Sequence, residues 1–339
     1  MPDDTHQNRT SRRAFLGAAA AGAASLTVSA AEGGAAEAKT AEPGAARPVR
    51  STVRDRLWLF CVAAGLDNDS FEKAGYRGGS RMTPAEGAFY LNVPNLLMIR
   101  SNDLPRLPGA ETWRVKTSFQ QYAISFAPLD RVVWSVIGSG GHGSLGETNH
   151  VVALAKEFPN ISGIYLDDFI RSEKQADGRY VGRPALSPDG LKQARAKLQA
   201  AGRPMDIWVT LYRHHLVPTH PHHIPYDPPL ASFIDSFDVP CLWTWNADEL
   251  PQLEETLMAL EAVAPKKRRI ALGLYMWDYP NKRPVPLELM QLQCEQGLNW
   301  LKEGRVQELV FLGNTMLDLG APSGAFSREW IAKVGTQPI

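Results

Sequence analysis

Short apolar runs recur along the chain at a nearly constant interval, and most of them end in polar or charged residues. They begin at Leu57, Leu96, Val132, Ile161, Ile207, Val239, Ile270 and Leu309. Their mean spacing is about 36 residues, which is the length of one strand, one helix and two connecting loops. The runs are continuously apolar, as expected of parallel strands that are covered on both faces. The pattern therefore predicts a single (β/α)8 barrel.

The predicted strands are 57–62, 95–99, 131–137, 161–166, 206–211, 238–242, 269–274 and 308–312. Helix signals lie between them. Thr83 to Glu86 forms a capping box with proline at the first helical position, Ser187 begins a second helix, and 287–302 has apolar residues at three- and four-residue steps. A doubly wound open sheet is the rival fold, but it requires a glycine-rich phosphate turn after the first strand, and 62–66 lacks one.

The first thirty residues have the features of an export signal. Arg12 and Arg13 lie in a segment that matches the twin-arginine signature, an apolar stretch follows at 18–26, and Val28 to Ala30 offers small residues for a signal peptidase. The apolar stretch is too short and too weakly hydrophobic for a stable membrane anchor. We therefore expect the twin-arginine export machinery to be a partner and the protein to be periplasmic or extracellular.

Three segments follow from this pattern. Residues 1–30 are the expected twin-arginine signal peptide. Residues 31–53, rich in Ala, Gly, Glu and Pro, are an expected disordered linker. Residues 54–339 are the expected barrel, at a usual size for one such domain.

Composition excludes some partners. Lys plus Arg and Asp plus Glu both number 36, so no excess of basic residues indicates nucleic-acid binding. We expect a neutral or weakly charged small molecule or polymer as ligand. The cysteines Cys61, Cys241 and Cys294 have no metal-clip spacing, and we expect buried, inert thiols.

Asp167 and Asp168 end the fourth predicted strand, and barrel active sites lie at the carboxyl ends of strands. Two adjacent carboxylates repel, so in a dry cleft they require a proton, a cation or a metal ion between them. Strand alternation puts Asp167 on the face of Gly163 and Tyr165, which suits the centre of the barrel. Asp168 either joins the site or caps loop amides.

The segment Gly163 to Asp167 resembles the Gly-x-x-x-Asp ending of the fourth strand in several glycoside hydrolase barrels. Among these are α-glycoside-cleaving barrels and the polygalactosaminidase-type family. The resemblance covers these five residues and the order of the barrel, and it implies that Asp167 is the nucleophile or a transition-state stabiliser. The chain lacks the Asp-x-x-Asp-x-Asp-x-Glu signature of chitinase-like barrels, which argues against substrate-assisted chemistry.

Glycoside cleavage requires a second carboxyl group on the other side of the bond. We favour Asp278, which ends the seventh strand beside Trp277, because an apolar neighbour raises the pKa of a carboxyl and suits it to act as an acid. Glu249 is the next candidate, and Glu147 on the third loop also remains open. Asp248 is the weakest, since it occupies the position of a helix N-cap.

Aromatic residues gather at neighbouring strand ends: Trp243, Trp245, Tyr275 and Trp277. Flat rings with a polar edge can stack on sugar faces, although such residues are also common in cores. We expect Trp245 and Trp277 to form a sugar platform and the mid-strand Trp208 to be core. The substrate would then be an oligo- or polysaccharide.

The rim of the predicted site adds Arg100, Tyr212, Arg213, His214 and Asn314. The two arginines could hold a uronate, lower the pKa of the catalytic aspartate, or form structural ion pairs. We expect the other three side chains to bind sugar hydroxyls.

The main hypothesis is an exported carbohydrate-active hydrolase that cleaves glycosidic bonds with two carboxyl groups and no cofactor. One alternative is a metal-dependent hydrolase or sugar isomerase, because His214, His215, His220, His222 and His223 crowd the loop after the fifth strand. No His-x-His follows the first strand, where metal-dependent amidohydrolases usually carry it, so a divalent metal remains the alternative. A non-catalytic glycan-binding barrel is the third hypothesis.

Overall fold

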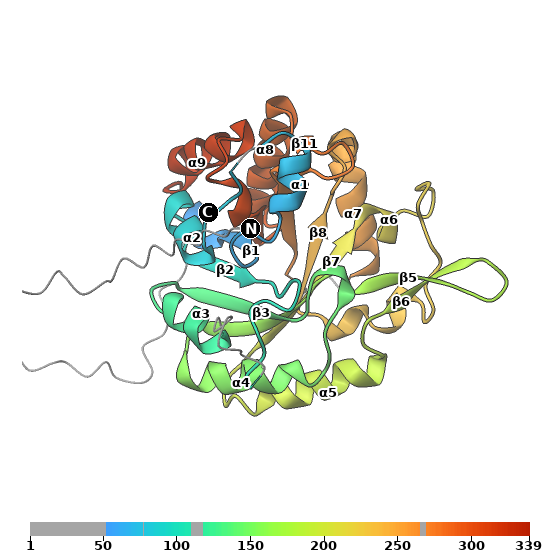
Figure 1. Cartoon of the computed structure of the whole chain (residues 1–339). Helices are drawn as coiled ribbons and strands as arrows, with labels where there is room; N and C mark the ends of the chain where they lie inside the picture. The colour runs from blue at the N-terminus through green and yellow to red at the C-terminus, as the bar shows by residue number, and fades with distance from the viewer. Residues whose placement is uncertain (1–51, 77, 110–117, 265–268) are drawn as a thin grey trace, which may run out of the picture. The chain divides into compact units, whose positions relative to one another are not determined.

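The computed structural model describes residues 52–76, 78–109, 118–264 and 269–339 (Figure 1). The expected signal peptide and nearly all of the expected linker lie outside the described residues. Thr52 and Val53, which we had assigned to the linker, belong to the folded domain. Val53 is fully buried, and its amide donates to the carbonyl of Gln337 at 2.9 Å.

Eight parallel strands form a closed barrel at the centre of this domain (Figure 1). In chain order they are β1 (Leu57–Cys61), β2 (Asn95–Met98), β3 (Arg131–Ile137), β4 (Ile161–Leu166), β7 (Asp206–Tyr212), β8 (Val239–Trp243), β9 (Ala271–Tyr275) and β12 (Glu308–Leu312). Strand β1 pairs with both β2 and β12, which closes the barrel. The predicted (β/α)8 fold is confirmed, with each strand within two residues of its predicted bounds.

Helices surround the barrel and cover the outer faces of the strands (Figure 1). The α-helices are α1 (Asn68–Lys73), α2 (Pro84–Leu91), α3 (Phe119–Ser125), α4 (Glu147–Glu157), α5 (Pro188–Gln199), α6 (Arg213–Leu216), α7 (Leu253–Val263), α8 (Leu287–Glu303) and α9 (Pro322–Val334). Short 3-10 helices are η1 (Val53–Arg56), η2 (Ser139–Gly141), η3 (Leu230–Ser232), η4 (Ile234–Ser236), η5 (Ala247–Gln252) and η6 (Asn314–Met316). The predicted capping box of α2 forms, since the Thr83 amide donates to Glu86 at 2.9 Å and the Glu86 amide to the Thr83 hydroxyl at 3.3 Å. None of the helices in the described part of the chain combines the length and apolar content of a membrane span.

Two small hairpins interrupt the βα repeat. Strands β5 (Ile170–Lys174) and β6 (Tyr180–Pro184) pair and project from the barrel directly after β4 (Figure 1). Strands β10 (Trp277–Asp278) and β11 (Arg283–Pro284) pair after β9. Neither hairpin contains the apolar run that marks a barrel strand, because β5 is mostly exposed and charged and β10 has only two residues.

Aromatic and aliphatic side chains fill the interior of the barrel. Trp208 is buried as predicted, and its ring centroid lies 4.8 Å from that of Trp58. The predicted buried thiols are confirmed: all three cysteines are buried and free.

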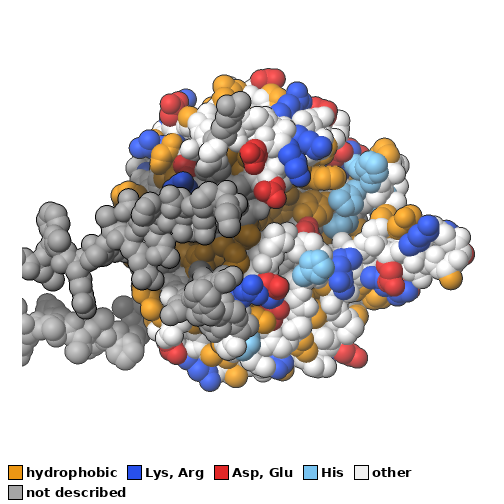
Figure 2. Space-filling model, viewed as in Figure 1, with side chains coloured by type: hydrophobic (Ala, Val, Ile, Leu, Met, Phe, Trp, Pro, Cys, Tyr) orange, Lys and Arg blue, Asp and Glu red, His pale blue; other side chains and the backbone are white. Residues whose placement is uncertain are grey.

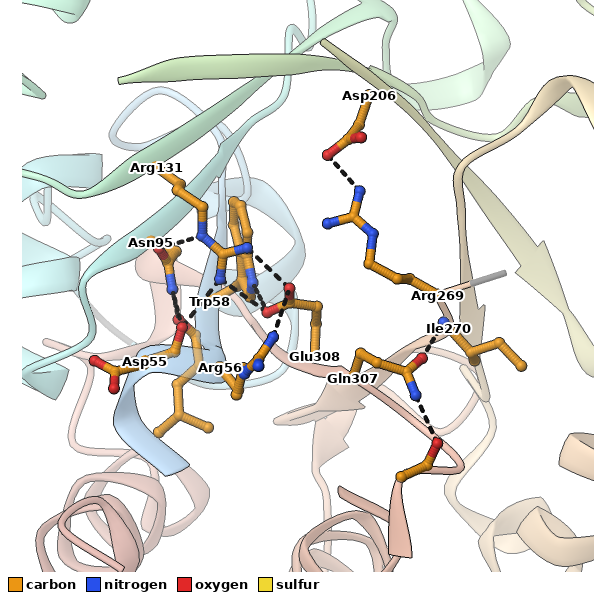
Figure 3. A network of polar contacts seen from close by, with 12 residues as sticks. Asp55, Arg56, Trp58, Asn95, Arg131, Asp206, Arg269, Ile270, Gln307 and Glu308 are labelled. Carbon is orange, nitrogen blue, oxygen red and sulfur yellow. Dashed lines mark hydrogen bonds and ion pairs between the residues drawn. The ribbon is translucent and has the colours of Figure 1, made fainter. Parts of the chain in front are cut away.

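A polar network stabilises the amino-terminal end of the barrel, away from the strand ends that carry chemistry (Figure 3). Glu308 is fully buried and accepts hydrogen bonds from Arg131 at 2.9 and 3.0 Å and from the Trp58 indole at 2.7 Å. The Arg131 guanidinium lies over the Trp58 ring at 4.5 Å and also donates to Asn95 at 3.0 Å. Because each buried charge is paired and hydrogen-bonded, this network supports the fold rather than the reaction.

Candidate active site

A cavity of about 460 Å³ opens at the carboxyl ends of the strands. Its acidic lining residues are Asp67, Asp167 and Asp168. Its aromatic lining includes Tyr212, Trp243, Trp245, Tyr275 and Tyr279. The volume and this mixture of aromatic walls with a few polar groups are typical of a small-molecule or sugar site.

Asp167 directly follows β4 and lines the cavity, as the strand alternation predicts. It is buried, its amide donates to the Ile137 carbonyl at 2.9 Å, and its Oδ1 accepts the Thr210 hydroxyl at 2.9 Å. Burial, followed by the negative charge of Asp168, raises the pKa of Asp167 well above its ordinary range. A carboxyl whose pKa is raised in this way suits a general acid.

A chain of hydrogen bonds leads from Trp243 to Oδ1 of Asp167. The Trp243 indole donates to the Tyr165 hydroxyl at 3.0 Å, and the Tyr165 and Thr210 oxygens lie 2.9 Å apart. Because an indole can only donate, every bond is satisfied when Tyr165 donates to Thr210 and Thr210 donates to Oδ1 of Asp167. In this arrangement Oδ1 is an acceptor, and Oδ2 is the oxygen that is able to carry a proton.

Asp168 also lines the cavity, because its backbone departs from the strand conformation. Its φ of 42° lies in the left-handed region, so two successive side chains reach the same cavity. Its Oδ1 accepts the Tyr212 hydroxyl at 2.6 Å and its Oδ2 accepts the Gly140 amide at 2.7 Å. Asp168 thus combines both roles that we had considered, since it caps a loop amide and belongs to the site. Two short hydrogen bonds therefore fix the position of the Asp168 carboxyl group.

The aromatic wall is as predicted except at one position. Trp243, Trp245 and Tyr275 line the cavity, and Trp245 is 39 % exposed at its rim. Trp277 does not line it. Its ring is buried against Phe71 at 5.0 Å, so it belongs to the core rather than to the expected sugar platform.

Tyr212 and His214 line the cavity together. Their rings stack with centroids 5.3 Å apart and an interplanar angle of 10°. Burial, followed by the positive charge of His220, lowers the pKa of His214 to about 4. The ring is therefore neutral near pH 7 and can both donate and accept a hydrogen bond.

The two residues that we expected to supply the second carboxyl do not line the cavity. Asp278 is fully buried, and its Oδ2 accepts hydrogen bonds from Asn281 at 2.9 Å and from Arg283 at 3.2 Å. The reason is that Asp278 belongs to β10, whose pairing with β11 brings Arg283 against it. Glu249 lies in η5, where its carboxylate contacts Nε2 of His220 at 3.1 Å.

The predicted arginines are also absent from the cavity lining, because other carboxylates hold them. Arg100 pairs with Glu147 at 2.9 Å and with Asp103 at 2.7 Å. Arg213 pairs with Glu255 at 2.6 Å. The structural ion-pair alternative is therefore the one observed. Among the described residues no Lys or Arg lines the cavity, so its electrostatic character is acidic.

Asn314 lines the cavity, but its amide is already occupied. Its Oδ1 accepts the Val62 amide at 3.0 Å, and its Nδ2 donates to the carbonyls of Val62 at 3.0 Å and Met82 at 2.8 Å. We had expected this side chain to bind sugar hydroxyls. Instead it joins the loop after β12 to the end of β1.

The predicted histidine cluster gathers over α6 (Figure 2). His215 accepts the Tyr212 amide at 3.1 Å, and His223 contacts the His214 carbonyl at 3.0 Å. Within the ranges that the structure describes, no group of three or more His, Cys, Asp or Glu side chains is arranged to hold a metal ion. Two of the histidines therefore contact backbone atoms of β7 and α6.

Sequence reasoning missed Asp67 and Tyr279, both of which line the cavity. Asp67 lies in the loop after β1, and its Oδ2 accepts the Thr315 hydroxyl at 2.7 Å. Burial raises the pKa of Asp67. Burial, followed by the charges of Asp67, Asp167 and Asp168, raises the pKa of Tyr279. The only signal in the sequence was an acidic residue shortly after the first strand.

The chain matches no protein-family model and no curated protein sequence. Its fold is similar to that of a candidate alpha-L-fucosidase from Bacteroides thetaiotaomicron, with a TM-score of 0.52, 9% identity, and coverage of 88% of this chain and 99% of that one. A spore cortex-lytic enzyme from Bacillus cereus has a TM-score of 0.47 and 9% identity, over 81% of this chain and 73% of its own. A candidate chitinase A from Streptomyces coelicolor has a TM-score of 0.47 and 13% identity, over 83% and 100%. At 9% identity the similarity to the fucosidase shows the barrel fold alone. The other two structures, with TM-scores below 0.5, support no conclusion about this chain.

Proposed function

We propose that the protein is a carbohydrate-active hydrolase that cleaves glycosidic bonds in the cavity at the carboxyl ends of the barrel strands. The observation that carries this proposal is the buried carboxyl of Asp167, whose pKa is raised and which lines a cavity walled by Trp243, Trp245 and Tyr275. An acid beside aromatic rings is what the cleavage of a stacked sugar requires.

In this reaction Asp167 is the general acid, and its Oδ2 gives a proton to the leaving glycosidic oxygen. The resemblance to other barrels implies a nucleophile or stabiliser at this position, but the raised pKa of Asp167 favours the acid. Asp168, held in place by Tyr212 and Gly140, stabilises the positive charge that develops on the sugar ring.

The charge of the cavity limits the substrate class. Its described lining has three aspartates and no Lys or Arg. A uronate would therefore meet negative charge without a cation to bind it, whereas a neutral or basic sugar would not. We propose a neutral or basic oligo- or polysaccharide as substrate, with Trp245 as the stacking platform at the rim.

The test is cleavage of a panel of glycans and aryl glycosides by the purified protein, measured as reducing ends or released phenol. Asp167→Asn should lower kcat on poor leaving groups by about 10²–10⁴-fold. Asp189→Asn is the matched control, because Asp189 is an exposed residue of α5 whose one ion pair among the described residues is with the exposed Lys192. Glycan binding without cleavage would instead indicate a non-catalytic glycan-binding barrel.

We also propose that the reaction requires no cofactor. The two carboxyl groups of Asp167 and Asp168 are held by protein donors rather than by histidines. Activity should persist after chelation and dialysis. Loss of activity with a chelator, and its return with a divalent metal, would support the metal-dependent hydrolase or isomerase instead.

Export by the twin-arginine route is a further part of the proposal, and it rests on Arg12 and Arg13. Replacement of both by lysine should retain the full-length chain in the cytoplasm of a bacterium that has this route. Cell fractionation with immunodetection is the measurement, and an unchanged periplasmic or extracellular yield would contradict the proposal.

A further inference from the structure

Asp67 is the cavity carboxyl to which the reaction above gives no role. It lies between β1 and α1 and is half-buried, and its Oδ2 accepts the Thr315 hydroxyl at 2.7 Å. Thr315 belongs to η6, directly after β12. Two neighbouring strand ends therefore hold Asp67 at the cavity wall. Within the described residues Oδ1 has no hydrogen-bond partner, which leaves this oxygen for a water molecule or a ligand.

Asp67 and Asp167 stand on different walls of one space. In the barrel order, β1 is separated from β4 by β2 and β3. Tyr279 lines the same cavity, and the negative charges of Asp67 and Asp167 both contribute to its raised pKa. The neighbouring charge that raises the pKa of Asp167 is that of Asp168. Asp67 and Asp167 therefore line one cavity of about 460 Å³ from strands that are not adjacent in the barrel.

A purely structural role explains Asp67 poorly. It immediately precedes α1, where aspartate commonly caps the helix, but its side chain makes no capping hydrogen bond. Among the described residues no Lys or Arg forms an ion pair with it. Burial removes water from this carboxyl group, and neither a cation nor a capping hydrogen bond compensates for that loss. A carboxyl group of this kind in the lining of a cavity is a candidate functional group.

We propose that Asp67 is the general base of the glycosidase reaction proposed above, and this role rests on that function. Its carboxylate removes a proton from water as the water oxygen bonds to the anomeric carbon. The bond from that carbon to the leaving oxygen breaks, and the leaving oxygen takes the proton of Asp167. One water is consumed, Asp67 ends protonated and Asp167 ionised, and solvent resets both. Attack from the face opposite the leaving group inverts the anomeric configuration.

Leaving-group dependence separates the two carboxyls. Dinitrophenolate is a good leaving group and departs without a proton, so Asp167→Asn should keep much of the wild-type activity on a dinitrophenyl glycoside. On the matching phenyl glycoside the same variant should lose about 10²–10⁴-fold in kcat. Asp67→Asn should lose about 10²–10⁴-fold on both. It should also lose the acidic limb of the kcat/KM profile, since that limb reports the base. The carbonyl of Asn can still accept the Thr315 hydroxyl, so the fold should survive, and Asp189→Asn is again the control.

Three outcomes are distinguishable. Asp67→Asn with an unchanged kcat and acidic limb, beside an impaired Asp167→Asn, would overturn the role of Asp67 while leaving the proposed function intact. A first-formed product of retained configuration, read by NMR, would likewise overturn it, because retention requires a nucleophile rather than a base. Failure of the wild-type protein to cleave any glycoside would overturn the function itself, and the role of Asp67 with it.

Discussion

Asp167→Asn should make the protein more stable, and the gain should grow with pH. Burial and the charge of Asp168 raise the pKa of Asp167 in the folded state. In the unfolded chain the same carboxyl ionises near its ordinary pKa of about 3.9. Between these two pKa values the folded state binds the extra proton, so the stability of the wild-type protein falls as pH rises through this window. Asparagine does not titrate, so the variant lacks this loss.

The magnitude follows from the number of protons involved. One proton corresponds to a slope of about 1.4 kcal/mol per pH unit inside the window. Two pH units within it therefore separate the variant from the wild type by about 2.7 kcal/mol. The slope vanishes below the unfolded pKa and above the folded one. Asparagine preserves the hydrogen bond from Thr210, because its carbonyl oxygen can replace Oδ1.

The assay is guanidinium unfolding of both proteins at a series of pH values, with the free energy of unfolding compared at each. Asp189→Asn, on an exposed residue, should show no such trend. Parallel pH dependence of wild type and Asp167→Asn would show that Asp167 is ionised in the folded protein. That result would refute its assignment as the general acid.

Three further changes test other parts of the structure. Glu308→Leu should cost about 3–5 kcal/mol of stability, because Arg131 would remain buried and unpaired, and a chemical melt within 1 kcal/mol of wild type would contradict this. The hydrogen bond from Thr210 lowers the pKa of Asp167, and Thr210→Val removes it. The alkaline limb of the kcat/KM pH profile should therefore move up by about 1–2 pH units. Thr210→Ser keeps the hydroxyl and should leave this limb in place. Trp245→Ala should raise KM roughly fivefold, for about 1 kcal/mol of lost stacking, with little change in kcat; an unchanged KM would remove Trp245 from the sugar platform.

The barrel could be predicted from the sequence because its strands are buried on both faces. Strands such as Val239–Trp243 appear as continuous apolar runs with a polar residue on each side. The charged β5–β6 hairpin has no such run, and its pairing depends on the turn between its strands. Periodicity alone therefore left it as part of a loop.

The candidate site could be predicted only where a side chain belongs to a strand end. Asp167 follows β4 directly, and strand alternation directs it to the cavity. Asp278 also follows a strand end, but the β10–β11 pairing brings its carboxylate against Arg283. Asp67 was missed because it lies in the loop after β1 rather than at the strand end. The path of that loop brings Asp67 to the cavity wall, and no local sequence pattern predicts this path.

The most direct test of the central claim is the cleavage of neutral and basic glycosides by the purified wild-type protein, with Asp167→Asn measured beside it. We expect release of reducing sugar by the wild type, and a fall of about 10²–10⁴-fold in the variant on substrates with poor leaving groups. Equal cleavage by both proteins, or cleavage by neither, would contradict the assignment of Asp167 as the acid of a glycoside hydrolase.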